Sequence, residues 1–107
     1  MLKIEHYQDE DGGNPFRAWF GKLRDVVAKT AVLKRIDRVT LGNLGNCRDV
    51  GNGITELKID IGPGYRIYLA HRGERLVILL CGGNKSTQSK DIELARKYWL
   101  DWKRRQA

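Results

Sequence analysis

The sequence predicts an α+β fold in which an antiparallel sheet packs against an N-terminal helical hairpin and a C-terminal helix. Two early segments and the last one repeat apolar residues at helical spacing, whereas glycine-rich turns separate short apolar runs in the middle of the chain. The predicted order is β-α-α, then three or four strands, then α. The 107 residues have room for one domain, residues 1–107.

The first predicted elements are a short strand and a helix. Leu2, Ile4 and His6 alternate with polar neighbours, which is the period of a strand. Asn14-Pro15 then indicates a helix start, because Asn caps free N–H groups and Pro has no N–H to leave unpaired. Four large apolar residues follow at helical spacing, Phe16, Trp19, Phe20 and Leu23. We expect this aromatic stripe to pack in the core rather than to bind a ligand.

A second helix is predicted from about Asp25 to Leu41, and Gly42 ends it. Its repeating positions are Val26, Leu33, Ile36 and Thr40. Together the two helices are expected to form a hairpin packed by aromatic and aliphatic side chains.

The second half of the chain predicts strands and a last helix. The strand segments are Cys47–Gly51, Ile54–Ile61, Tyr65–His71 and Leu76–Cys81. Gly62-Pro63-Gly64 is expected to join the middle pair as a hairpin loop, and Gly82-Gly83-Asn84 to end the last strand. Ser89 or Thr87 is the predicted cap of the helix that follows. Its apolar stripe is Ile92, Ala95, Trp99 and Trp102.

The composition favours a basic protein of the cytoplasm. The net charge is +7, and the half from residue 54 onward contributes 11 − 6 = +5 of it, which favours RNA, DNA, the ribosome surface or an acidic protein as partner. The longest apolar run, Leu76–Cys81, is too short to cross a membrane. Cys47 and Cys81 lack the spacing of a zinc site or a disulfide framework.

Side-chain alternation predicts one polar face on the middle strands. With a symmetric loop, Asp60 lies opposite Arg66 and Lys58 opposite Tyr68, and Lys85 leaves the neighbouring strand toward them. The core face then holds Leu57, Ile59, Ile67 and Leu69. The polar face is either a surface of cross-strand ion pairs or a site for an anion. The run GGNK ahead of a helix favours the second interpretation, because it offers a lysine and backbone N–H groups to a phosphate.

Two stretches carry a specific resemblance: ELKIDIGPGYRIYLA at 56–70 and ILLCGGNKSTQSKDIELA at 78–95. Their motifs GPGYR and GGNKSTQ-x-x-DI resemble the RelE/ParE toxin superfamily, in particular its HigB-like branch of addiction module killer proteins and phage-derived RelE-like toxins. The resemblance implies a fold of the microbial ribonuclease type and a toxin of a type II toxin–antitoxin pair that cleaves mRNA, commonly on the ribosome. It also implies a co-encoded helix-turn-helix antitoxin, HigA-like, and a complex with it that binds operator DNA.

The resemblance also implies roles for single residues. Arg66 matches the arginine near the scissile phosphate, Lys58 a catalytic or phosphate-binding lysine, and Lys85 a basic residue after the last strand. Contacts to RNA are expected from Tyr68, by stacking on a base or by lying near the leaving group, and from Gln88 and Lys90. The chain departs from RelE in reading Ser86-Thr87-Gln88 where a tyrosine is expected, and no histidine lies in the motif. The general base and acid are therefore not identified.

The chemistry expected of this cluster uses no metal or other cofactor. The 2′-hydroxyl of RNA attacks the adjacent phosphate, and a fork-shaped arginine binds two phosphate oxygens. Two alternatives stay open. A ParE-like toxin poisons DNA gyrase without a nuclease site, and an inactive relic would only bind nucleic acid.

Overall fold

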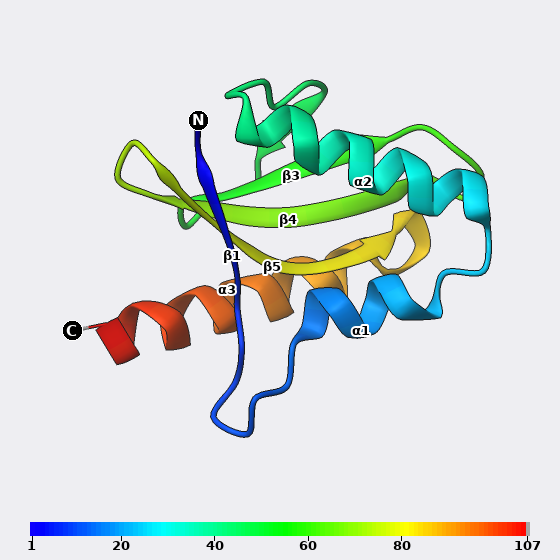
Figure 1. Cartoon of the computed structure of the whole chain (residues 1–107). Helices are drawn as coiled ribbons and strands as arrows, with labels where there is room; N and C mark the ends of the chain where they lie inside the picture. The colour runs from blue at the N-terminus through cyan, green and yellow to red at the C-terminus, as the bar shows by residue number, and fades with distance from the viewer. Residues whose placement is uncertain (107) are drawn as a thin grey trace.

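The computed structural model describes residues 1–106, which form one five-stranded sheet with helices on both faces. In chain order the elements are β1 (Lys3–His6), α1 (Pro15–Lys22), α2 (Val26–Thr40), β2 (Cys47–Asp49), β3 (Ile54–Ile59), β4 (Tyr65–Arg72), β5 (Leu76–Asn84), the 3₁₀ turn η1 (Lys85–Thr87) and α3 (Gln88–Gln106). α1 and α2 cover one face and α3 covers the other (Figure 1). The α+β class, the helical hairpin and the C-terminal helix are confirmed. No helix within residues 1–106 is both long and apolar enough to cross a membrane.

The sheet is mixed rather than antiparallel throughout, which corrects the prediction. Its strand order is β1-β5-β4-β3-β2, and β1 runs parallel to β5, with Ile4 opposite Val77. All other neighbours are antiparallel. Alternation in the first residues marks a strand, but the neighbour of that strand comes from the other half of the chain. No local signal therefore sets its direction, unlike in a hairpin.

Both early helices begin where predicted. The Asn14 carboxamide oxygen accepts a hydrogen bond from the Arg17 N–H at 3.0 Å, and the Asp25 carboxylate accepts one from the Val27 N–H at 2.9 Å. The predicted stripe of α2 is wrong at Val26 and Leu33, which are 74% and 53% exposed, whereas Ile36 packs against the core as expected. The buried positions are Ala28, Val32, Arg35 and Val39. Because one of these four buried residues is an arginine, a pattern of apolar residues alone does not identify this face of α2.

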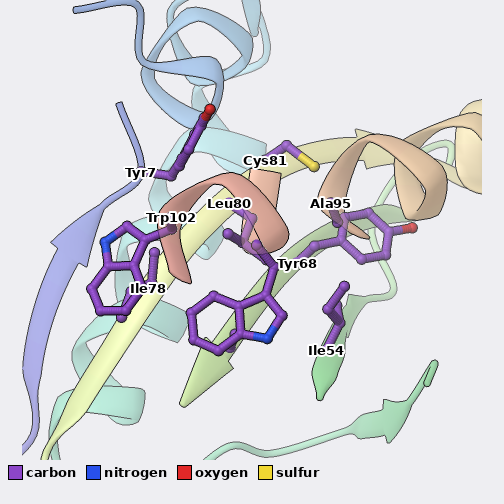
Figure 2. Close-up of a cluster of buried hydrophobic side chains, with 10 residues drawn as sticks. Tyr7, Ile54, Tyr68, Ile78, Leu80, Cys81, Ala95 and Trp102 are labelled. Carbon is purple, nitrogen blue, oxygen red and sulfur yellow. The ribbon is translucent and has the colours of Figure 1, made fainter. Parts of the chain in front are cut away.

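α3 packs its predicted stripe on the second face of the sheet. Ala95, Trp99 and Trp102 are buried against Ile54 and Ile78 among others (Figure 2). The cap of the helical segment is Asn84, which corrects the choice of Ser89 or Thr87. The Asn84 side chain accepts hydrogen bonds from the Ser86 and Thr87 N–H groups at 2.9 and 3.2 Å, and the Thr87 hydroxyl accepts one from the Asn84 N–H.

Gly82-Gly83-Asn84 continues β5 instead of ending it. A Cβ on Gly82 would lie 2.2 Å from the Trp19 ring, and a Cβ on Gly83 would lie 1.7 Å from a carboxylate oxygen of Asp91. These contacts come from α1 and α3 on opposite faces of the sheet. The two glycines therefore let both helices approach the strand closely, and they do not break it.

The register of β3 and β4 differs from the prediction by two residues. Ile59 lies opposite Tyr65, Lys58 opposite Arg66 and Glu56 opposite Tyr68, so the loop runs from Asp60 to Gly64. The Ile61 N–H bonds the Ile59 carbonyl, which takes Ile61 out of the ladder. Because side chains alternate with a period of two, this shift leaves each side chain on its predicted face but changes which residues are opposite. The predicted pairing of Asp60 with Arg66 is wrong.

Candidate functional site

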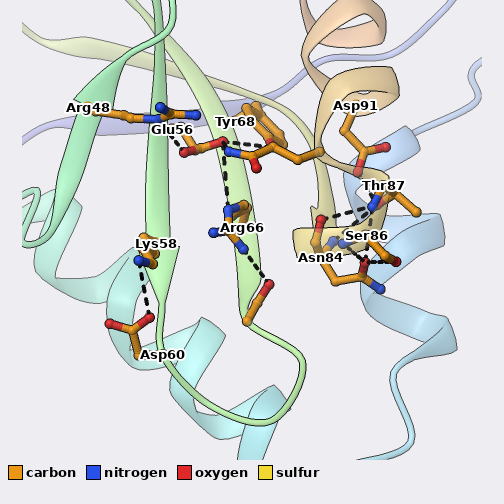
Figure 3. A network of polar contacts seen from close by, with 12 residues as sticks. Arg48, Glu56, Lys58, Asp60, Arg66, Tyr68, Asn84, Ser86, Thr87 and Asp91 are labelled. Carbon is orange, nitrogen blue, oxygen red and sulfur yellow. Dashed lines mark hydrogen bonds and ion pairs between the residues drawn. The ribbon is translucent and has the colours of Figure 1, made fainter.

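A cleft of about 360 Å³ lies where β2, β3 and β4 meet the start of α3. Its lining residues are Asn46, Cys47, Arg48, Glu56, Lys58, Arg66 and Gln88. The strand residues Arg48, Glu56, Lys58 and Arg66 are brought together by the register, since Arg48 pairs with Glu56 and Lys58 with Arg66. Two arginines, Arg48 and Arg66, thus face the buried Glu56 carboxylate, and Lys58 lies next to Asp60 in the same cleft (Figure 3).

Glu56 is the centre of the polar network, a role that sequence reasoning missed. Its side chain is 2% exposed. One carboxylate oxygen accepts a hydrogen bond from the Arg48 Nε–H at 2.8 Å, and the other accepts from the Tyr68 hydroxyl and the Gln88 amide, each at 2.9 Å. Burial raises the pKa of Glu56, but the donors Gln88, Arg48 and Tyr68 together outweigh it and lower the pKa below its usual value. Glu56 is therefore ionised at neutral pH and orients the groups around it.

This lowered pKa leads to a test of acid stability. The ionised Glu56 stabilises the fold above the pKa of an unfolded glutamate, about 4.3, and this contribution is lost as the pH falls through the lower folded pKa. We expect Glu56→Gln to be less stable than the wild type at neutral pH and to lose less stability on acidification. Urea unfolding across the acid range measures both. Equal losses in the two proteins would contradict the role given to Glu56.

Arg66 lies in the cleft with its guanidinium held by two groups. It is 5% exposed, its Nη1–H donates to the Gly64 carbonyl at 2.8 Å, and its Nε lies 3.9 Å from the nearer Glu56 oxygen. Within residues 1–106 this buried Nε–H has no hydrogen-bond partner. The Nε–H faces the Glu56 carboxylate beyond hydrogen-bonding distance, so Arg66 and Glu56 form a loose buried ion pair within the cleft.

Lys58 lies beside Arg66 across the ladder and reaches the same cleft. Its side chain is 45% exposed and its Nζ lies 3.7 Å from a carboxylate oxygen of Asp60, which is itself 69% exposed. An exposed pair of this kind contributes little to stability. The ammonium group of Lys58 is therefore free to turn toward an anion at Arg66.

The other predicted residues lie in different places. Lys85, in η1, is exposed, and within residues 1–106 it is not among the residues that line the cleft. Its Cβ nevertheless lies close to Gly64, at the end of the cleft where Arg66 lies. Gln88 lines the cleft, and its amide is bonded to Glu56. Lys90 is exposed and, in the part of the chain that the structure describes, does not line the cleft. Tyr68 is fully buried, so its ring has no free face and the predicted stacking on a base is wrong.

Tyr68 instead stabilises the polar network by donating a hydrogen bond from its buried hydroxyl to Glu56. Burial raises the pKa of its hydroxyl, and the hydrogen bond to Glu56 raises it further. The phenol consequently stays neutral and keeps donating to Glu56. The position of Tyr68 on the polar face of β4 predicts an exposed ring. The ring is buried because α3 covers that part of the face.

Two arginines of the site were missed from the sequence. Arg48, on β2, contributes a side chain that is 61% exposed and oriented by Glu56. Arg35, on α2, is buried and donates to three backbone carbonyls, from Nε to Leu44 at 3.0 Å, from Nη1 to Lys58 at 2.6 Å and from Nη2 to Asn46 at 2.5 Å. Arg35 therefore fixes the backbone of two cleft residues. Arg35 lies seven residues after Ala28, which is about two helical turns, and so lies on the same buried face of α2. This spacing is the sequence signal that could have identified it.

Taken together, a small basic α+β fold and a cationic cleft with an ionised glutamate are compatible with the class of RelE-like toxins. The family model for "Phage derived protein Gp49-like (DUF891)" matches residues 18–99, a range that includes every residue lining the cleft. This chain belongs to the Gp49-like family, a RelE-like toxin family of the toxin–antitoxin superfamily. A protein of Haemophilus influenzae described as uncharacterized is 51% identical over 81 residues, which covers 76% of this chain and 82% of that protein. Membership of a toxin family implies an antitoxin partner.

Proposed function

We propose that this chain is a HigB-like toxin that cleaves mRNA. The observation that supports it is the position of Arg66 and Lys58 side by side in a cleft, next to a buried glutamate that orients the polar network. A protein that acts only by covering a partner does not require cations to converge in this way. Arg48, Lys85, Gln88 and Lys90 are proposed to contact RNA around the cleft.

The proposed reaction is attack of the RNA 2′-hydroxyl on the adjacent phosphorus. The 2′-hydroxyl passes its proton to solvent water, the 2′-oxygen forms a bond to phosphorus, and the bond to the 5′-oxygen breaks. The products are a 2′,3′-cyclic phosphate and a 5′-hydroxyl. Arg66 binds the non-bridging oxygens, where negative charge increases in the transition state. Lys58 is placed to donate a proton to the leaving 5′-oxygen. Glu56 acts as a positioning residue, because both of its oxygens already accept hydrogen bonds.

The proposed partners follow from the same assignment. A co-encoded helix-turn-helix antitoxin, HigA-like, neutralises the toxin, and the complex binds operator DNA. The substrate is mRNA in the cytoplasm, engaged on the ribosome. The fold of residues 1–107 acts as a single toxin domain.

The experiment that tests this function is brief expression in cells followed by mapping of new mRNA 5′ ends. We expect discrete cuts that carry 5′-hydroxyl groups within translated frames, and no cuts with Arg66→Ala. The control is Arg75→Ala, which removes an exposed arginine in the turn before β5. Growth arrest with intact mRNA would instead point to gyrase or another protein target. Intact mRNA without arrest would indicate a relic that only binds nucleic acid.

A further inference from the structure

The cleft continues into two further hollows that lead to α2. It shares Asn46 and Lys58 with a hollow of about 310 Å³, which in turn shares Ala31, Lys34 and Ile61 with one of about 340 Å³. The loop after β3 and the first turns of α2 lie at the same end of the molecule (Figure 1). We call this continuous path, from Arg66 around the edge of β3 to the start of α2, the α2 groove.

The groove exists because β2 is shorter than β3. β2 begins at Cys47, opposite Leu57, so the edge of β3 beyond that pair has no neighbouring strand. The Lys58 N–H donates to the Asn46 carbonyl, and the Arg35 guanidinium donates to that carbonyl and to the carbonyl of Lys58. The floor of the groove at this edge is therefore held in place by buried hydrogen bonds.

Cations line the middle of the α2 groove. Lys34 and Arg38 are exposed and lie one helical turn apart on α2, and Lys58 lies on the β3 side. Within residues 1–106 neither Lys34 nor Arg38 forms an ion pair. Asp60 is the single acidic residue among those described in the lining of this middle hollow, and it faces Lys58, while Glu56 is the acidic residue at the Arg66 end. The charge of this path is therefore positive from Arg66 to Lys34.

We infer that Lys34 and Arg38 bind phosphates of the RNA strand on one side of the bond that is cleaved, an inference that rests on the proposed function. A row of cations, of which Lys34 and Arg38 have no ion-pair partner within residues 1–106, matches a chain of phosphates. The path bends around a sheet edge, which a single strand can follow and a stiff duplex cannot. The far end is apolar, with Val26 and Val27 at 74% and 64% exposure, and this surface suits contact with a base. The substrate is thus a single strand several nucleotides long.

The test measures binding rather than cleavage, so that it is independent of the chemistry at Arg66. The probes are 2′-O-methyl RNAs, which lack the attacking hydroxyl, as a dinucleotide and as a decanucleotide. The variant is Lys34→Gln with Arg38→Gln, which keeps helix propensity. The matched control is Arg17→Gln with Lys97→Gln, which removes the same charge from exposed positions away from the groove.

We expect the wild type to bind the decanucleotide more tightly than the dinucleotide. The double variant should lose at least tenfold in affinity for the decanucleotide, and the slope of log K against log salt should fall by roughly 1.4, for two lost phosphate contacts on a single strand. Dinucleotide binding should not change. Equal decanucleotide binding by the variant and the control would overturn the inference, as would tighter binding of a polyglutamate peptide that depends on Lys34 and Arg38. If the proposed nuclease function alone is wrong, mRNA in cells stays intact while the decanucleotide still binds in a way that depends on Lys34 and Arg38.

Discussion

Arg66→Lys is expected to lower the rate constant for RNA cleavage by about two to three orders of magnitude, the usual cost of removing one transition-state donor. Lysine keeps the charge but lacks the planar fork that binds two phosphate oxygens at once. It also cannot donate to the Gly64 carbonyl and face Glu56 with the spacing that Arg66 has. Single-turnover cleavage of a ribo-oligonucleotide measures the effect.

The fold of this variant should survive, because Glu56 keeps its donors Arg48, Tyr68 and Gln88. Urea unfolding checks this point, and Arg75→Lys provides a matched exchange outside the cleft. A variant that folds normally and cleaves within a factor of ten of the wild type would remove Arg66 from the proposed mechanism.

Arg35→Met is expected to lower the free energy of unfolding by about 2 kcal/mol or more, because it removes the Arg35 donor from the Leu44 and Lys58 carbonyls at about 1–3 kcal/mol each. The Asn46 carbonyl keeps the Lys58 N–H as a donor and adds less. Methionine keeps part of the apolar stem, so the loss reports mainly on the hydrogen bonds to Leu44, Asn46 and Lys58. Denaturant unfolding at neutral pH measures it.

Two further variants make this expectation specific. Arg35→Lys should recover part of the stability, since one ammonium group cannot reach three carbonyls at the same geometry. Arg38→Met, on the exposed face of the same helix, should stay within about 0.5 kcal/mol of the wild type. A loss at Arg35 no larger than at Arg38 would show that the carbonyls find other partners.

Part of the candidate site was predictable from alternation alone. Lys58 and Arg66 were placed on one face of adjacent strands, and a register error of two residues did not change that result, because side chains repeat their direction every second residue. The same alternation puts Glu56 on that face, two residues before Lys58, yet its role depends on Gln88 and Arg48, which reach it from other elements. In the sequence, a carboxylate on the same face as two basic residues resembles an exposed ion pair, and only its burial shows otherwise.

The sequence by itself determined the α+β class, the starts of α1 and α2 at Asn14 and Asp25, and the core face of β3 and β4, since caps and alternation act within a few residues. Only the tertiary structure decided the parallel pairing of β1 with β5, the burial of Tyr68 and the close approach of Trp19 and Asp91 to Gly82 and Gly83. Each of these depends on contacts between segments far apart in the chain. Which of those segments meet is set by packing of the whole molecule, and local propensity does not specify it.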